Sequence, residues 1–147
     1  MMAIDKEPKQ GITRMDKVML IFFDEDFKLL LQHRTDDAPA FPSYWCVFGG
    51  EVEEGETWGQ ALKREIKEEL DYDIKDPRHV LTIECVNDAE EGTVGDRVYF
   101  VEKCLDKSGL VLGEGQGMGW FSYEEILKLK IIDHNLEAIK KVFPTLK

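Results

Sequence analysis

The segment at residues 50–72, GEVEEGETWGQALKREIKEELDY, decides how this chain is interpreted, because it places three carboxylates close together on one predicted helix. Glu65, Glu68 and Glu69 are spaced so that their side chains cluster on one helical face. Such like charges repel one another, and a hard divalent cation with oxygen ligands neutralises them best. The alternative is a solvated acidic face, which describes most Glu-rich helices. A Gly-Gly pair, a second acidic loop and an embedded arginine favour the cation site.

The same segment carries the pattern of an amphipathic helix. Thr57 is a predicted N-cap, and an apolar stripe follows it at helical spacing, formed by Trp58, Leu62, Ile66 and Leu70. The carboxylates lie off this stripe, so the helix can bury one side while its acids stay at the edge and beyond.

The rest of the chain alternates predicted strands and helices, which indicates a sheet covered by helices. Strands are predicted at residues 17–23, 27–33, 45–48, 79–87, 97–105 and 119–121. Residues 24–26 are expected to form a tight hairpin connection, residues 35–44 a loop, and residues 49–50 a turn. Ser122 and Glu125 predict a capping box before a short helix, and residues 135–143 a terminal amphipathic helix. Residues 1–13 are predicted to be a tail or edge segment, and residues 14–147 a single domain.

Composition limits the setting and the partners. The formal net charge of −11 argues against binding to a nucleic acid polymer, although metal ions can still bring a small polyphosphate to an acidic site. No run of 18 apolar residues and no signal-like N-terminus is present, so we expect a cytoplasmic protein that does not enter a membrane. Cys46, Cys85 and Cys104 form no CxxC pair. Three buried thiols are therefore favoured over a redox or zinc role.

The segment at residues 50–72 resembles the Nudix box, whose pattern is Gly-x5-Glu-x7-Arg-Glu-aliphatic-x-Glu-Glu-x-Gly-aliphatic. The matching positions are Gly50, Glu56, Arg64, Glu65, Ile66, Glu68 and Glu69. Asp71 replaces the final Gly, Tyr72 replaces the aliphatic residue, and Phe48 stands where many relatives have Pro. Asp tolerates the left-handed turn expected at position 71 at a cost of roughly 1 kcal/mol relative to Gly. The resemblance implies an α/β (α+β) fold: an α/β/α sandwich with a mixed β-sheet.

The resemblance also implies a reaction, the hydrolysis of a nucleoside diphosphate linked to another moiety X. The expected cofactor is Mg²⁺, with Mn²⁺ as the alternative, because these ions neutralise phosphate oxygens and acidify a bound water. The implied metal ligands are Glu65, Glu68, Glu69 and the backbone carbonyl of Gly49. Glu65 or Glu68 is the expected base for the attacking water. Arg64 is grouped with these catalytic residues, although its expected part, with Glu56, is to hold the preceding loop against the helix; the alternative is an ordinary surface ion pair.

Outside the box, Glu114-Gly115-Gln116 followed by Trp120 resembles a segment of the MutT-type nucleoside triphosphate pyrophosphohydrolases. By that resemblance Glu114 is a fourth metal ligand, and Arg34 contacts the substrate phosphates. Gly50 is also expected beside the substrate. Asn135 falls where the group has an asparagine that reads a purine edge, whereas from the residues alone it is equally an N-cap.

These observations predict a small-molecule enzyme, a monomer or homodimer, that cleaves a purine nucleoside triphosphate, oxidised or not, to the monophosphate and pyrophosphate. One alternative keeps the chemistry but takes a nucleotide sugar or similar diphosphate, because the proline-containing loop at residues 36–44 can shape a different pocket. The other alternative is a catalytically idle binding or regulatory module. The intact set of glutamates argues against that module.

Overall fold

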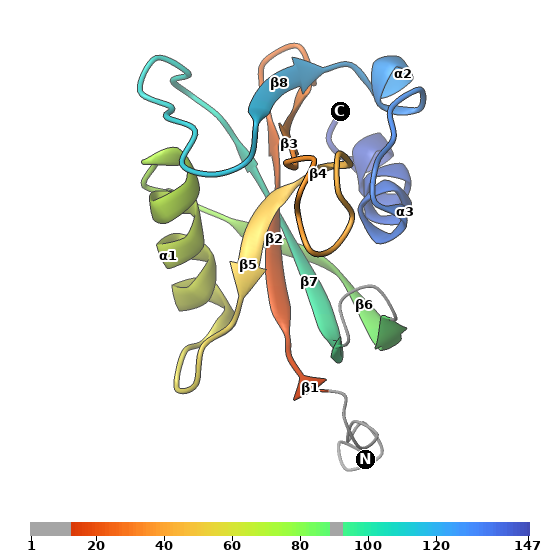
Figure 1. Cartoon of the computed structure of the whole chain (residues 1–147). Helices are drawn as coiled ribbons and strands as arrows, with labels where there is room; N and C mark the ends of the chain where they lie inside the picture. Colours follow the sequence, from red (N-terminus) through yellow and green to blue (C-terminus); the bar gives the residue numbers. More distant parts are fainter. Residues whose placement is uncertain (1–12, 89–92) are drawn as a thin grey trace.

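Figure 1 shows the computed structural model of the chain, in which residues 13–88 and 93–147 are described. Most of the predicted N-terminal tail, residues 1–12, and residues 89–92 of the acidic connection lie outside the described residues. The strands are β1 (Thr13–Arg14), β2 (Lys17–Phe23), β3 (Leu29–His33), β4 (Trp45–Cys46), β5 (Phe48–Glu51), β6 (Arg78–Asp88), β7 (Thr93–Lys103) and β8 (Gly117–Phe121). The helices are α1 (Trp58–Leu70), α2 (Tyr123–Ile126), α3 (Asp133–Val142) and a 3₁₀ turn at Phe143–Thr145.

Strand β2 is the centre of the sheet. It pairs in parallel with β7, from Lys17 opposite Arg97 to Phe23 opposite Lys103. Its other side pairs antiparallel, with β5 along its first half and with β3 at its end. β6 lies beyond β7, and β8 pairs with β3. The sheet is therefore mixed, as the family resemblance implied.

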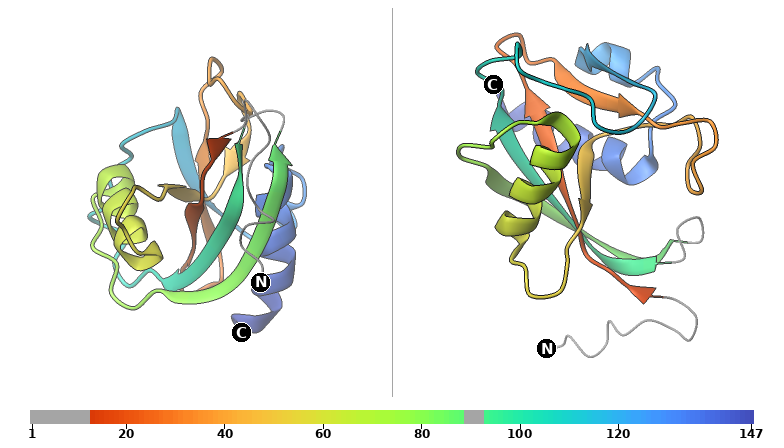
Figure 2. Two further views of the ribbon diagram at one scale, coloured as in Figure 1. Left: turned by 90° about the horizontal axis from the view of Figure 1, so that it is seen from below. Right: turned by 60° about the vertical axis from the view of Figure 1, so that its left-hand side comes forward.

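The helices α1 and α3 lie on opposite faces of the sheet (Figures 1 and 2), which gives the predicted three-layer arrangement. The strand period of two sends alternate side chains of β2 to the two faces. One core therefore joins Val18, Leu20 and Phe22 to α1, and the other joins Met19 and Ile21 to α3. Both faces of the central strand are buried, so the sheet is a fixed platform for the segments that follow β2, β3 and β5.

Both ends of α1 follow the residue pattern. Thr57 accepts a hydrogen bond from the backbone N–H of Gln60, and the Gln60 side chain accepts one from the N–H of Thr57, so the helix begins with a capping box. Asp71 ends the helix in the left-handed conformation, with φ 54° and ψ 39°, and its N–H donates to the Lys67 carbonyl. The prediction that Asp serves here in place of Gly is confirmed.

Three predicted boundaries were wrong for local reasons. The β2–β3 connection spans residues 24–28, because Asp24 Oδ1 accepts hydrogen bonds from the N–H groups of Asp26 and Lys28, and Phe27 adopts a φ of 61°. The strand predicted at 45–48 is split into β4 and β5, which pair with β3 and β2 respectively. The predicted turn at Gly49 and Gly50 is instead the middle of β5, where the missing side chains admit a neighbouring strand and a helix side chain.

Other differences are shifts of a few residues. β7 begins at Thr93, four residues before the predicted start, and β1 begins at Thr13, so pairing with β7 includes the last residue of the predicted tail. The three cysteines are buried and free, as expected. Among the described residues, no helix is both long and apolar enough to span a membrane.

Candidate active site

A cleft of about 520 Å³ lies over β5, beside the carboxyl-bearing side of α1. Segments far apart in sequence meet in it: α1, β5, the end of β3, the loop before β8 and the start of α3. Of the residues predicted from sequence, the cleft gathers Arg34, Gly49, Gly50, Glu65, Glu69, Glu114 and Asn135. Glu56, Arg64 and Glu68 are outside its lining.

Glu69 is the most buried acid of the site, with 5% of its surface exposed. Its Oε1 accepts a hydrogen bond of 3.0 Å from the backbone N–H of Gly49. Burial, together with the nearby charges of Glu114 and Glu65, raises the pKa of Glu69 to about 9, although the hydrogen bond from Gly49 acts to lower it. This carboxylate is therefore held among other acids and away from water, an arrangement that a cation would relieve.

Glu65 lies directly against the backbone of Gly50. A methyl group added at Gly50 would lie 2.5 Å from Oε1 of Glu65 and closer still to its Cδ and Oε2. Gly49 is equally confined on its other side, where an added methyl group would overlap the Val18 carbonyl oxygen and lie 2.8 Å from Cα of Met19. The Gly-Gly pair is thus required because β2 and an α1 carboxylate both approach the backbone of β5.

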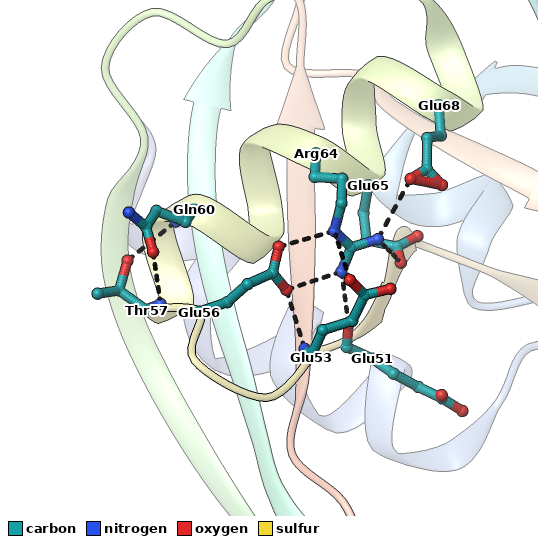
Figure 3. Close-up of polar contacts among 8 residues, drawn as sticks. All are labelled: Glu51, Glu53, Glu56, Thr57, Gln60, Arg64, Glu65 and Glu68. Carbon is teal, nitrogen blue, oxygen red and sulfur yellow. Dashed lines mark hydrogen bonds and ion pairs between the residues drawn. The ribbon is translucent and has the colours of Figure 1, made fainter.

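Arg64 joins the loop before α1 to the carboxylates of the helix (Figure 3). Its Nε and Nη2 donate to the two carboxylate oxygens of Glu56 at 2.7 and 2.9 Å, in a bidentate pair. Its Nη1 donates to Oε1 of Glu65 at 2.9 Å and to Oε1 of Glu68 at 3.3 Å, and its Nη2 also reaches the Glu51 carbonyl at 3.0 Å. Arg64 therefore pairs with Glu56, the partner expected from the resemblance, and also with Glu65 and Glu68.

Arg64 acts to lower the pKa of two carboxyl groups with which it pairs, those of Glu56 and Glu65. Its hydrogen bonds, together with one from the Glu53 backbone N–H, lower the pKa of Glu56 to about 2. Burial raises the pKa of Glu65, and the pairing with Arg64 only partly opposes that shift. Glu56 is thus a fixed anion of the scaffold, whereas Glu65 is a partly buried carboxyl at the cleft wall.

Glu68 differs from the other two box carboxylates. Its side chain is 58% exposed and pairs with Arg64 instead of lining the cleft. The helical period explains the difference, because Glu65 and Glu69 are four residues apart and nearly eclipsed, whereas Glu68 is rotated about 100° from Glu69. The sequence pattern grouped the three acids on one helical face, but Glu68 points away from the cleft that Glu65 and Glu69 line.

The loop that carries Glu114 is attached to both α1 and β3. The N–H groups of Val111 and Gly113 donate to the carbonyls of Leu70 and Glu69 at 2.9 and 2.7 Å, which satisfies the last turn of α1. On the other side, Nε2 of Gln32 donates to the Glu114 carbonyl at 3.0 Å. Glu114 is exposed, but its backbone is held from two directions beside Glu69.

Two further predicted residues face the cleft with defined partners. Arg34 donates from Nε to the Ala40 carbonyl at 3.0 Å. Asn135 is 4% exposed and lies in the first turn of α3, whose N-cap is Ile132, so the N-cap alternative for Asn135 was wrong. Its Oδ1 accepts from the N–H of Val47 and its Nδ2 donates to the Tyr99 hydroxyl, both at 2.9 Å.

The cleft residues that the sequence reasoning did not single out include Lys17, Gln32 and Arg97. Arg97 is 1% exposed, and its Nη1 donates to the Met15 carbonyl at 3.1 Å. It was placed at a strand start because β7 was predicted four residues too short. The available signal was a basic residue directly before the apolar run at residues 98–101, since arginine is rarely buried without a specific role.

The NUDIX domain family model matches residues 13–142, which covers all the elements that build this cleft. The chain belongs to the NUDIX family. This family consists of hydrolases that bind small nucleotides and generally use divalent metal cations.

Individual relatives resemble the NUDIX chain over part of their length. It is 38% identical to dihydroneopterin triphosphate diphosphatase of Escherichia coli strain K12 over 72 residues, which are 48% of this chain and 42% of that protein. It is 40% identical to nucleoside triphosphatase NudI of Escherichia coli strain K12 over 57 residues, or 39% of this chain and 40% of NudI. The matches thus span about two fifths of these relatives.

The fold resembles that of a MutT NUDIX hydrolase from Burkholderia pseudomallei, with a TM-score of 0.76 at 20% identity. That likeness covers 88% of this chain and 98% of the other. The predicted family and fold are confirmed.

The donors of this NUDIX cleft suit a hard divalent cation. Glu65, Glu69 and Glu114 offer only oxygen, and their mutual charge effect on Glu69 is the kind that such a cation reverses. Within residues 13–88 and 93–147, no three His, Cys, Asp or Glu side chains are already gathered at metal-binding distance. The donor chemistry therefore fits a cation, which would draw the three carboxylates closer than they stand here.

Proposed function

We propose that this protein is a metal-dependent pyrophosphohydrolase that cleaves a purine nucleoside triphosphate, including oxidised forms, to the monophosphate and pyrophosphate. The observation that carries the proposal is Glu69, a buried acid hydrogen-bonded to the Gly49 N–H beside Glu65 and Glu114. The relatives with triphosphatase and triphosphate diphosphatase names support the substrate class. The proposal includes Mg²⁺, replaceable by Mn²⁺, and a cytoplasmic monomer or homodimer.

The acidic wall of the cleft would hold the cation through Glu65, Glu69, Glu114 and the Gly49 carbonyl, with Glu68 entering on a rotamer change. When bound, Mg²⁺ neutralises phosphate oxygens and acidifies a water. Arg34, directly after β3, lines the same cleft and supplies a fixed positive charge to the phosphates. The triphosphate would thus be bound between the acidic residues, through the metal ion, and the positively charged Arg34.

Proton removal from the attacking water is assigned to Glu65 or Glu68. Burial already raises the pKa of Glu65, which moves this carboxyl toward the range in which it both accepts and releases a proton. Arg64 and Glu56 act by position only, because they keep the loop, the helix and these two carboxylates in one arrangement. This arrangement is the reason that Arg64 belongs with the catalytic group without touching substrate.

Base recognition is assigned to Asn135. Its two hydrogen bonds use one lone pair of Oδ1 and one hydrogen of Nδ2, which leaves one of each for a ligand. Because the Val47 N–H can only donate, the amide cannot flip. A purine edge would therefore meet an amide of fixed orientation, in a cleft that Gly50 also lines.

The direct test is a panel of nucleoside triphosphates with Mg²⁺, an auxiliary pyrophosphatase and ¹⁸O-labelled water. We expect sustained phosphate release above the metal-only blank, with the label in one product identifying the attacked phosphorus. The discriminating comparison is Glu69→Gln, which removes the buried acid and keeps its shape. Phosphate release from no member of the panel would favour the idle binding module, and full activity of Glu69→Gln would remove the metal-site assignment.

A further inference from the structure

A second pocket, of about 300 Å³, lies at the end of the sheet where β6 begins and β7 ends. Register places Arg78 of β6 opposite Val101 of β7, and Phe23 of β2 opposite Lys103 of β7. Val101 and Phe23 belong to the core on the α3 face of the sheet. Residues that lie opposite each other in register point to the same face, so Arg78 and Lys103 share that face with them. Three neighbouring strands thus contribute side chains to one pocket.

This pocket is separate from the main cleft, although β2 and β7 contribute to both. Among the described residues, the two spaces have no lining residue in common. Lys17 and Arg97, which line the main cleft, lie opposite each other at the start of the β2–β7 pairing, and Phe23 and Lys103 lie opposite each other at its end. The offset from Lys17 to Phe23 corresponds to about 20 Å along the strand. A small molecule in the second pocket therefore does not occupy the candidate active site.

The second pocket gathers positive charge on a protein whose formal net charge is −11. Lys75, Arg78 and Lys103 line it, and all three are exposed. In the part of the chain that the structure describes, the side chains of Arg78 and Lys103 have no hydrogen-bond or ion-pair partner. Nζ of Lys75 lies 5.8 Å from the centroid of the Tyr72 ring. The three charges are therefore available to an anionic ligand.

Two acids also line the pocket, but they oppose these cations only in part. Glu102 is 6% exposed, and its carboxylate accepts hydrogen bonds of 2.8–3.0 Å from the backbone N–H groups of Lys75 and Asp76. These bonds stabilise the charge of Glu102 and hold the loop before β6 against β7. Asp76 is the exposed acid of the pocket. The cations thus outnumber the carboxylates, and one of the two carboxylates already has backbone partners.

The remaining lining is apolar. Phe23 is half-buried and has Phe27 stacked beside it, with ring centroids 6.3 Å apart. Val101 is 1% exposed, and Leu105 is 76% exposed. A guanidinium binds phosphate through two parallel hydrogen bonds, and aromatic and aliphatic side chains favour a flat ring. A volume of about 300 Å³ is at the lower end of the range for small-molecule pockets. The lining therefore fits a small ligand with a phosphate at one end and a ring at the other.

We propose that this second pocket binds a small phosphate monoester whose organic part carries a flat aromatic ring, at a site separate from the candidate active site. Lys75, Arg78 and Lys103 donate hydrogen bonds to the phosphate oxygens, and the ring lies against Phe23 and Leu105. Binding is non-covalent and requires neither a metal ion nor turnover. The proposal therefore goes beyond the proposed hydrolysis and does not depend on it. Nucleoside monophosphates combine the two required parts, and AMP is the probe.

The test is a titration of the full chain with AMP, without added metal, followed by methyl NMR. The methyl groups of Val101 and Leu105 report on the second pocket, and those of Met19 and Val47 report on the main cleft. We expect saturable shifts at Val101 and Leu105. Adenosine, which lacks the phosphate, should cause none, and inorganic phosphate, which lacks the ring, should bind at least tenfold more weakly than AMP. Shifts confined to Met19 and Val47, or equal affinities for AMP and inorganic phosphate, would overturn the proposal.

A pair of double variants tests the role of the charges. Arg78→Gln with Lys103→Gln should raise the Kd for AMP, measured at Val101, at least tenfold. Lys128→Gln with Lys140→Gln is the matched control, because it removes the same charge from exposed positions outside both spaces. Its Kd should match that of the wild type.

A single variant covers the case in which the double variant fails to fold. Leu105→Glu places a carboxylate at the exposed rim of the pocket and should also raise the Kd at least tenfold. A Kd that stays within twofold of the wild type in Leu105→Glu, or one that rises equally in the control pair and in the Arg78 and Lys103 pair, would contradict the proposal whether or not the protein hydrolyses a nucleotide.

Discussion

A methyl group added at Gly49 should lower stability, whereas one added at Gly50 should lower activity, although the two residues are adjacent in β5. The methyl group of Gly49→Ala would overlap the Val18 carbonyl and lie 2.8 Å from Cα of Met19, both of which are backbone atoms of the central strand. The three atoms nearest to the methyl group of Gly50→Ala would all belong to the carboxyl group of Glu65. Backbone in the middle of a sheet cannot move away cheaply, whereas the end of a glutamate can.

The magnitudes follow from these contacts. Overpacking a buried site costs about 1–3 kcal/mol, and Gly49→Ala should reach about 3 kcal/mol because the β2–β5 pairing itself must open. At roughly 2–4 °C per kcal/mol for a domain of this size, its Tm should fall by about 6–12 °C. In Gly50→Ala the Glu65 carboxylate must retreat from 2.5 Å to an ordinary contact of about 3.4 Å. A displacement of about 1 Å at a reacting centre can cost about 10²-fold in rate.

The assay is a thermal melt by circular dichroism together with kcat/KM for a nucleoside triphosphate and Mg²⁺. Gly50→Ala should melt within about 3 °C of the wild type, because a Gly→Ala change also stabilises through the unfolded chain by roughly 0.4–1 kcal/mol. It should nevertheless lose about two orders of magnitude in kcat/KM. Gly50→Ala with activity within threefold of the wild type, or Gly49→Ala with an unchanged Tm, would refute the reasoning.

Three further predictions concern the acids and the cleft. Glu68→Gln should lower turnover by orders of magnitude but keep its Tm within about 2 °C of the wild type, because the exposed Glu68 side chain contributes little to stability. Steady-state kinetics and a thermal melt check this, and an active variant would exclude Glu68 as metal ligand or base. Asn135→Ala should lose its preference for purine over pyrimidine substrates. Its free energy of unfolding in urea should fall by about 1–3 kcal/mol, because the Val47 N–H loses its acceptor. Unchanged base selectivity would leave Asn135 a purely structural role. Burial raises the pKa of Asp24, but hydrogen bonds from Lys107 and two backbone N–H groups outweigh burial, so the pKa is lowered overall. The ionised Asp24 therefore stabilises the fold at pH values above the pKa it has in the unfolded chain. This stabilisation is lost as the pH falls through the pKa of Asp24 in the folded protein. Lys107→Met should therefore lower Tm at pH 7 and flatten its decline on acidification, and parallel Tm–pH curves for the variant and wild type would contradict this.

The sequence predicted α1 well because its signals are local. The stripe ending at Leu70, the Thr57 cap and the left-handed Asp71 depend only on near neighbours, and each is found as expected. The turn assigned to Gly49 and Gly50 was wrong for the opposite reason. What fixes these glycines is close approach by β2 and by Glu65, and a sequence pattern carries no direct trace of such distant contacts.

In the candidate site, too, local spacing could be predicted from the sequence, whereas contacts between distant segments could not. Spacing placed Glu65 and Glu69 near one another, but it also grouped Glu68 with them, and only the orientation of the helix against β5 separates the acid that points away. Gln32 and Arg97 escaped because each acts across strands, Gln32 on the Glu114 loop and Arg97 on the cleft floor. The register of the sheet determines which residues lie next to Gln32 and Arg97, and a local sequence motif does not predict that register.

The hydrogen bonds from Val111 and Gly113 to the last turn of α1 have a consequence for how this protein tolerates change. They fasten the start of the 111–117 segment independently of the stretch that leads to it. Residues 108 and 109 lie exposed between Lys107, which pairs with Asp24, and this anchor, so the chain can vary in length there. An insertion there should alter the outline of the molecule while Glu114 keeps its position opposite Glu69, so natural or engineered diversity can accumulate in that connection without disturbing the chemistry beside it.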